Sequence, residues 1–244
     1  MRKSIKAFAA LIALLFTVSI YAATEIELEP ALNDPDNVNS LQRGARNFMN
    51  YCSGCHSAQY VRFNTLGRDL NLSEEQLVNN LMFNAEKTFE TIEATMPMDE
   101  ALRWFGQAPP DLSLIARARG TDYVFNFLKG FYLDPDSPTG VDNRVLAGTS
   151  MPHVLWELQG FQNAVFSTDE SGIEHFESFE QVTPGSMSAE EYDEFVRDTT
   201  NFLEYFSEPF RSTRRVVGVW VLIFLVFFWI IASMLKKQIW KDVT

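Results

Sequence analysis

The feature that most constrains this chain is the pentapeptide Cys52-Ser53-Gly54-Cys55-His56, which holds both cysteines of the 244 residues. The C-x-x-C-H spacing is the attachment signature of c-type haem, in which two thiols bond to the porphyrin and the histidine binds the iron. A thioredoxin-type dithiol or a metal site is the alternative, but that motif belongs near a βαβ pattern and the adjacent histidine favours haem. The motif therefore predicts one covalent haem c held by Cys52, Cys55 and His56.

The N-terminal 23 residues have the composition of a signal peptide. The apolar stretch Ala7–Ile20 precedes the small residues Ala22 and Ala23, which offer a cleavage site. The basic residues ahead of the apolar stretch are Arg2, Lys3 and Lys6. We therefore predict a signal peptide at residues 1–23 and export of the chain that follows. An uncleaved anchor is the alternative, because the residue three positions before the cleavage point is large.

A second apolar segment, near the C-terminus, predicts a membrane anchor. Val216–Leu235 contains 20 residues without a charge, which is enough to cross a bilayer as a helix. Three basic residues lie on each side, so the exported N-terminus decides the orientation. We expect a haem domain at residues 24–210 in the bacterial periplasm, an inner-membrane anchor with its basic flank at 211–235 and a cytoplasmic tail at 236–244.

Between these ends the chain is strongly acidic. The terminal segments hold nine of the 20 Lys and Arg residues, whereas 31 of the 32 Asp and Glu residues lie between them. This excess of negative charge argues against a nucleic-acid partner and favours a basic protein partner. A generally solvated acidic surface accounts for the same charge without any partner.

Helical spacing predicts a mainly α fold: a c-type cytochrome haem domain with loop and small hairpin insertions, plus one C-terminal transmembrane helix. A helix at 40–51, with Ala45, Phe48 and Met49 on one face, runs into the cysteines and places both thiols on one side, one turn apart. Further predicted elements are a helix after the capping box Ser73–Gln76, a short helix Leu112–Arg119 capped by Asp111 and ended by Gly120, a helix with Tyr123, Phe127 and Phe131 on one face, a loop at 134–148, a hairpin within 163–182, and a helix from the capping box Ser188–Glu191 to Pro209.

The residues leave the second axial ligand of the iron open between two methionines. Met96 and Met151 are each followed by a proline, which stiffens the loop and removes a backbone donor. Met151 is favoured because it follows the long loop after the aromatic helix, whereas a compact cytochrome would use the nearer Met96. His153 is a third alternative, while His175 lies in the acidic hairpin and is expected to be solvated. A methionine ligand raises the reduction potential of the haem iron.

An ordered set of short sequences resembles the cytochrome c1 family over essentially the whole chain from Leu41 onward. Arg43-Gly44 precedes the haem motif, and the run from Pro109 to Ile115 follows it. The segment 83–107, which contains Met96, matches the family only loosely. The remaining matches are Arg117 to Gly120, Asp122 to Phe125, Pro184-Gly185, Glu191 to Asp193, Asn201 to Leu203, Glu208-Pro209 and the tail Lys236 to Val243.

The resemblance implies roles for individual residues. It implies that Met151 is the second axial ligand and that Arg119 binds a haem propionate, for which a guanidinium supplies charge-assisted hydrogen bonds. By position alone, Arg119 is a cation at a helix C-terminus, where it interacts favourably with the helix dipole. Pro109 and Pro110 are implied to line the haem, with one carbonyl taking the Nδ1 proton of His56.

The resemblance also implies a function and partners. The family supplies the haem subunit of ubiquinol–cytochrome c oxidoreductase, the dimeric bc1 complex, in which the chain is an electron carrier without a substrate pocket of its own. The implied partners are cytochrome b, a Rieske iron–sulfur protein as donor and a cytochrome c as acceptor. The alternatives are an anchored cytochrome of another chain, such as a terminal oxidase subunit, and a haem enzyme or sensor with an open distal site.

Overall fold

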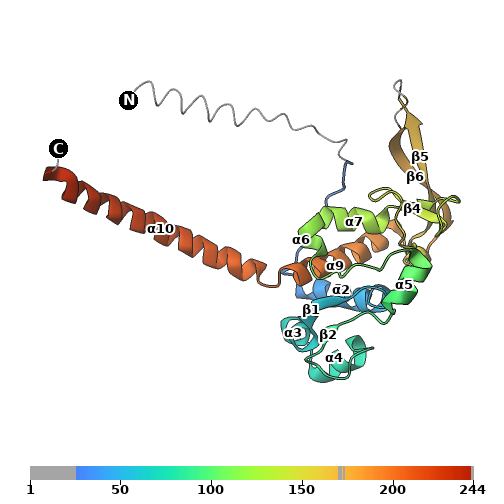
Figure 1. Cartoon of the computed structure of the whole chain (residues 1–244), viewed down its shortest axis with the longest axis horizontal. Helices are drawn as coiled ribbons and strands as arrows, with labels where there is room; N and C mark the ends of the chain where they lie inside the picture. The colour runs from blue at the N-terminus through green and yellow to red at the C-terminus, as the bar shows by residue number, and fades with distance from the viewer. Residues whose placement is uncertain (1–25, 170–171, 173, 243–244) are drawn as a thin grey trace.

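The computed structural model describes residues 26–169, 172 and 174–242, so the predicted signal peptide lies outside the described residues. Figure 1 shows a mainly helical body from which one long helix and one β-hairpin project. The elements, in chain order, are α2 (Val38–Tyr51), β1 (Ala58–Arg62), α3 (Phe63–Asp69), α4 (Glu74–Leu81), β2 (Thr91–Ile92), α5 (Met98–Phe105), α6 (Ile115–Arg119), α7 (Thr121–Lys129), β3 (Phe131–Leu133), β4 (Val141–Asn143), α8 (Trp156–Gln159), β5 (Gly160–Thr168), β6 (Glu174–Pro184), α9 (Ala189–Ser207), α10 (Arg211–Ile239) and the 3₁₀ turn η1 (Trp240–Asp242).

Helices α2 and α9 form the centre of the body and lie side by side (Figure 1). Phe48 of α2 is fully buried, and its ring centroid lies 5.8 Å from that of Phe202 and 5.3 Å from that of Phe206. The backbones approach so closely that a Cβ added to Gly44 would lie 2.1 Å from the carbonyl oxygen of Asp198. These contacts fix the helix that leads into the haem motif.

A polar network joins the same two helices beside the aromatic contacts. Arg43 donates to both carboxylate oxygens of Asp198, with Nε 2.5 Å and a terminal nitrogen 2.8 Å away. The hydroxyl of Ser40 donates to Asp198 at 2.6 Å and accepts from Asn201 at 2.6 Å. The Asp198 carboxylate is largely buried, so this bidentate partner offsets the cost of removing it from water.

Within the described residues the strands form three separate antiparallel pairs, β1–β2, β3–β4 and β5–β6. Strand β3 pairs with β4 from Phe131 opposite Asn143 to Leu133 opposite Val141. The prediction of an unstructured loop at 134–148 is therefore wrong for Val141–Asn143. A three-residue strand among glycine, proline and aspartate carries little periodic signal, and only the pairing with β3 creates it.

The predicted hairpin is confirmed and is longer than expected, since β5 and β6 pair from Gly160 opposite Pro184 to Thr168 opposite Glu174. Gly160 has a φ of +86°, and a Cβ there would lie 2.1 Å from the carbonyl oxygen of Thr183. Only glycine fits this combination of left-handed backbone and close approach. The two strands therefore approach closely at the base, where the amide of Gln162 also donates to the carbonyls of Lys129 and Phe131, while the far end of the hairpin projects from the body (Figure 1).

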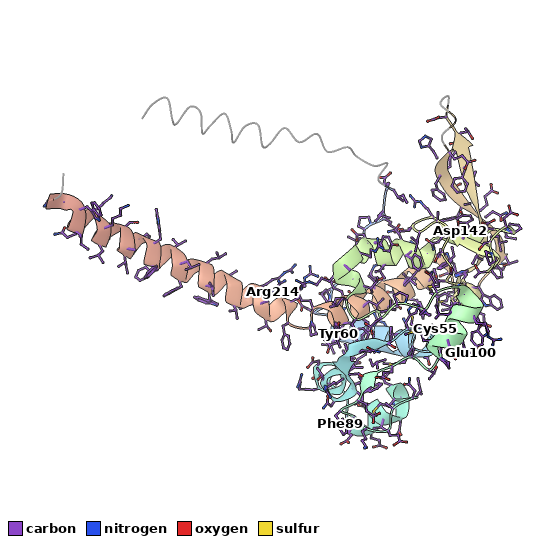
Figure 2. The ribbon with its side chains drawn as sticks, in the orientation of Figure 1. Cys55, Tyr60, Phe89, Glu100, Asp142 and Arg214 are labelled. Atoms are coloured by element: carbon purple, nitrogen blue, oxygen red, sulfur yellow. The ribbon has the colours of Figure 1, made fainter. Side chains whose placement is uncertain are left out.

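Helix α10 begins beyond Pro209 and projects from the body (Figure 1). Its stretch from Thr213 to Ile239 is long and apolar enough to cross a membrane. The most apolar part of this stretch is not buried against the rest of the protein. Ion pairs lie where α9 meets α10: Arg211 pairs with Glu204, and Arg214, which Figure 2 labels near the start of the long helix, pairs with Glu208 at 2.6 Å. The predicted single anchor is confirmed, and its helix continues past Leu235 to Ile239.

Two further predictions need correction. The short helix begins at Ile115 rather than Leu112, because the carboxylate of Asp111 accepts from the backbone of Ser113 and Gln59 instead of capping a helix. Helix α7 ends at Lys129, so Phe131 lies in β3 and not on the same helix as Tyr123 and Phe127. Both capping boxes are confirmed, with helices that begin at Glu74 and Ala189. Besides β3 and β4, the elements β1, α3, β2, α5, α8 and η1 were not predicted.

Candidate haem site

The C-terminus of α2 delivers the C-x-x-C-H motif. The helix ends at Tyr51, and the backbone N–H groups of Cys55 and His56 donate to the carbonyl of Cys52 at 3.0 and 2.8 Å. The motif therefore forms a turn of its own after the helix, which keeps the thiols three residues apart on a compact loop. The prediction that α2 leads directly into the motif is confirmed, although Cys52 is its C-cap rather than an interior residue.

The thiols and the imidazole together have the chemistry that a covalent haem needs. Neither cysteine forms a disulfide, and burial raises the pKa of both thiols, that of Cys52 to about 12 with a smaller effect from Cys55. His56 Nδ1 lies 2.8 Å from the carbonyl oxygen of Pro110, an acceptor only, so Nδ1 carries the proton and Nε2 has the free lone pair. Burial lowers the pKa of His56, against the opposing effects of Pro110 and Asp111. A neutral imidazole with a free Nε2 fits an iron ligand.

A strap formed by residues 109–113 holds the acceptor of His56 in place. Asp111 accepts from the backbone N–H of Gln59 at 2.9 Å and from that of Ser113 at 2.8 Å. The N–H of Leu112 donates to the carbonyl of Ser57 at 2.8 Å. Because these bonds join the strap to the chain just after the motif, the carbonyl of Pro110 cannot move independently of His56.

Loss of the Asp111 carboxylate is expected to loosen the strap. Asp111→Ala removes two charge-assisted hydrogen bonds, and we expect the free energy of unfolding in urea to fall by about 1–2 kcal/mol. Asp111→Asn keeps one acceptor oxygen and should lose less. The matched control is Asp136→Ala, at an exposed aspartate in the β3–β4 loop, for which we expect a change within about 0.5 kcal/mol. Equal effects of Asp111→Ala and the control would contradict this role.

The two candidate methionines lie in different surroundings. The backbone N–H of Met96 donates to the carbonyl of Gly54 at 3.0 Å, so this segment packs against the haem motif. Met151 lies in the loop after β4, and its N–H is 3.4 Å from the hydroxyl of Thr149. Both side chains are half-buried. These contacts do not choose between them, and the assignment of Met151 as ligand stays a prediction.

The two remaining histidines differ sharply in burial. His153 is 6% exposed, and its ring stacks on Phe131 with centroids 5.1 Å apart. Burial lowers the pKa of His153 to about 4, so the ring is neutral near pH 7. His175 is exposed on the hairpin with Nε2 3.0 Å from a carboxylate oxygen of Asp169, which confirms the expectation that it is solvated.

Arg119 lies in the last turn of α6 and is exposed, with its guanidinium 5.4 Å from the centroid of the Tyr123 ring. This position agrees with a cation at a helix C-terminus, and its role toward a propionate stays a prediction. Of the predicted site residues, the structure joins His56 to Pro110 by a hydrogen bond. The sequence analysis did not identify Gln59 and Ser113 as partners of Asp111; the Asp-x-Ser pattern after two prolines is a turn signal for Ser113, whereas no local pattern indicates Gln59.

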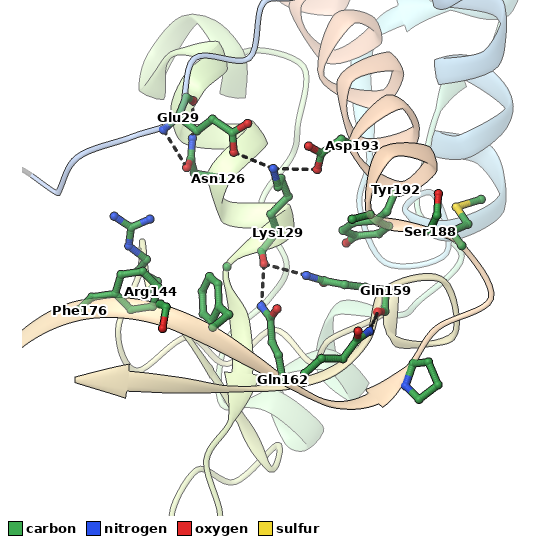
Figure 3. A pocket seen from close by; sticks show the side chains of 17 residues that line it. Glu29, Asn126, Lys129, Arg144, Gln159, Gln162, Phe176, Ser188, Tyr192 and Asp193 are labelled. Carbon is green, nitrogen blue, oxygen red and sulfur yellow. Dashed lines mark hydrogen bonds and ion pairs between the residues drawn. The ribbon is translucent and has the colours of Figure 1, made fainter. Parts of the chain in front are cut away.

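A cavity of about 580 Å³ lies elsewhere, between the base of the hairpin, α7 and the start of α9 (Figure 3). Lys129 pairs there with Glu29 and Asp193, each at 2.7 Å, and its carbonyl accepts from the amides of Gln159 and Gln162. None of the predicted haem-site residues lines it. Figure 3 shows Lys129 at the centre of these bonds, where the N-terminal segment, α7, the base of the hairpin and the start of α9 meet.

Comparison with known proteins adds the family. The model described as the cytochrome C1 family matches residues 32–243. The chain belongs to the cytochrome c1 family. Members of this family bind one covalent haem c, as the C-x-x-C-H motif predicts.

Three curated relatives illustrate this membership. A protein named cytochrome c1 from Allochromatium vinosum is 48% identical over 88% of this chain and 89% of its own length. One named ammonia monooxygenase gamma subunit, from Nitrosomonas europaea, is 40% identical over 90% of both chains. One from Candida albicans, named mitochondrial cytochrome b-c1 complex catalytic subunit, is 26% identical over 84% of this chain and 72% of its own. The family, the haem motif and the anchor helix together make this chain a membrane-anchored, single-pass cytochrome.

Proposed function

We propose that the chain carries single electrons by a covalently bound haem c as a subunit of a respiratory bc1 complex. The observation that carries this proposal is the C-x-x-C-H turn with its two free thiols and with His56 held by Pro110, in a member of the cytochrome c1 family. When bound, the haem supplies an iron centre that changes oxidation state by one electron.

The residues of the chain have distinct roles in this proposal. Cys52 and Cys55 hold the porphyrin through thioether bonds, and the free Nε2 of His56 binds the iron. Met151 would be the second protein ligand of the iron, and its thioether would favour a high reduction potential. With His56 and Met151 both bound to it, the iron would have no place for a substrate and would serve electron transfer. Arg119 donates hydrogen bonds to a propionate.

Pro109 and Pro110 have a different role in the proposal, which is to form an apolar wall beside the haem. Pro110 also accepts the Nδ1 proton of His56 at 2.8 Å, which fixes the tautomer and the plane of the imidazole. A fixed ligand plane reduces the structural change on electron transfer. The chain performs no bond-making chemistry itself and is a non-catalytic subunit.

The proposed partners follow from the family and from the charge. The donor is a Rieske iron–sulfur protein, the acceptor is a cytochrome c, and cytochrome b is a neighbour in a dimeric complex. The acidic body attracts a basic acceptor and raises the rate of encounter. The name of the Candida albicans relative, which places that protein in a b-c1 complex, supports the same assignment.

The proposed topology has the haem domain, residues 24–210, in the bacterial periplasm. Residues 211–235 anchor it in the inner membrane, and residues 236–244 lie in the cytoplasm. Removal of residues 1–23 on export belongs to the same proposal. The exposed apolar helix α10 supports the anchor, and the need for an exported C-x-x-C-H motif supports the orientation.

Gentle extraction of the membrane tests the function directly. The full chain, carrying an affinity tag, is purified in mild detergent, and the recovered proteins are identified by mass spectrometry. We expect cytochrome b and an iron–sulfur protein in constant ratio to this chain. A tagged single-pass protein without a haem motif, expressed in the same cells, is the control for non-specific recovery.

Other recovered partners would change the conclusion. Recovery with terminal oxidase subunits would support the alternative of another electron-transfer chain. Recovery with a monooxygenase would support a role for this chain like the one in the name of the Nitrosomonas europaea relative, a monooxygenase subunit. Either result without cytochrome b would overturn the proposed function.

A further inference from the structure

His153 lies two residues after Met151, and its buried ring belongs to a group of aromatic side chains that reaches from the buried Phe131 to the exposed Trp156. Its ring is nearly parallel to that of Phe131, at an interplanar angle of 10°, and meets the edge of Phe161 at a centroid distance of 6.3 Å. Phe161 in turn stacks on Trp156, with centroids 5.6 Å apart. The ring of His153 thus lies between a ring of β3 and a ring of β5.

The nitrogens of His153 do not explain its burial. Neither nitrogen meets hydrogen-bond geometry with a partner among the described residues, and both are inaccessible to solvent, although the backbone of Gly160 lies close enough to raise the pKa of the ring against the larger effect of burial. A buried polar atom without a partner destabilises the fold. The packing of the flat ring, and not the hydrogen bonding of its nitrogens, therefore explains why His153 is buried. Such a ring, enclosed between two phenylalanines, is poorly placed to bind iron.

The chain is also anchored on the other side of Met151. Asp142 accepts from the N–H of Gly148 at 2.7 Å and from that of Thr149 at 3.3 Å. Thr149 is 7% exposed, and its hydroxyl accepts from the N–H of Met151 at 3.4 Å. Pro152, between Met151 and His153, has a fixed φ. The Met151 loop is therefore held by a buried threonine before it and a buried histidine after it.

We propose that His153 is a positioning residue, whose stacked ring holds Met151 where its thioether can bind the iron. This inference rests on the proposed function, in which Met151 is the second axial ligand. A thioether is a weak ligand, so it competes with external ligands only if the loop keeps it at high effective concentration. Loss of the stacked ring frees the backbone on one side of Met151 and lowers that concentration.

Imidazole binding to the full chain, purified with its haem in mild detergent, tests the inference. His153→Ala removes the ring, and we expect imidazole to displace the thioether at about tenfold lower concentration, the ratio that follows from freeing roughly one ordered residue. The sulfur–iron absorption band at the red end of the spectrum should weaken, and the reduction potential should fall. His153→Phe keeps a flat ring and should stay within about twofold of the unmodified chain.

Two further variants make the test specific. Phe179→Ala removes from the hairpin an aromatic ring whose centroid lies 4.7 Å from that of the Phe176 ring. This variant should leave imidazole binding unchanged. If His153→Ala does not accumulate, His153→Leu replaces it, because leucine keeps apolar volume without the stack. We expect about a threefold effect from leucine, on the same physical grounds.

The possible failures are distinguishable. If Met151→Leu keeps the sulfur–iron band, the ligand assignment in the proposed function is wrong and the inference fails with it. If Met151→Leu loses the band while His153→Ala, or its leucine replacement, binds imidazole like the unmodified chain, the ligand stands and the positioning role is overturned. If His153→Phe is as impaired as His153→Ala, the nitrogens matter and the stacking argument is overturned.

Discussion

Gly44→Ala is expected to destabilise the haem domain by at least about 3 kcal/mol, because the added methyl group cannot fit between α2 and α9. The new Cβ would lie 2.1 Å from the carbonyl oxygen of Asp198 and 2.7 Å from the Cβ of Phe202. One of these atoms is part of the backbone and the other is a Cβ, and neither moves when a side chain changes rotamer. No rotamer change therefore relieves the contact. The helices must separate, which also disturbs the bidentate bond from Arg43 to Asp198.

Gly67→Ala is the matched control, since Gly67 is also a helical glycine in the domain. There an added Cβ would meet only the end of the flexible Leu77 side chain, at 3.0 Å. We expect a change within about 1 kcal/mol, because alanine also favours the helix. Urea unfolding followed by circular dichroism measures both variants. A Gly44→Ala chain as stable as Gly67→Ala would show that α2 and α9 tolerate a wider separation.

Met151→Leu is expected to abolish the sulfur–iron absorption band and to make the ferric iron high-spin, because leucine has no atom that binds iron. The band should fall below about one tenth of its normal intensity, and the reduction potential should change with the loss of the thioether. Leucine is close to methionine in volume, so the free energy of unfolding should change by less than about 1.5 kcal/mol. Absorption and electron paramagnetic resonance spectra measure the ligand change separately from stability.

Met96→Leu is the control for this assignment. Met96 shares the following proline and the half-buried side chain, and its backbone contacts Gly54 of the haem motif. We expect the band to survive in this variant. A band that survives Met151→Leu and disappears in Met96→Leu would assign the ligand to Met96 instead.

Elements stabilised by near neighbours in the sequence were predictable. The capping boxes at Ser73 and Ser188 satisfy helix N–H groups within three residues, and both helices begin as predicted. The hairpin was recognised because alternation and a turn signal lie in one segment. Strand β4 and helix α5 were missed, because a short strand depends on its partner and the N-cap of α5 is Pro97, which makes no side-chain hydrogen bond.

The site divides in the same way. The sequence alone determined a covalent haem and a single membrane anchor, and it predicted His56 as a ligand of the iron, because each depends on local spacing or on one continuous apolar segment. Only the tertiary structure decided that Pro110 accepts from His56, 54 residues away, and that Gly44 lies against Asp198. It also placed the His153 ring between Phe131 and Phe161. Such contacts join distant segments, and their partners are selected by packing in three dimensions, which no local pattern specifies.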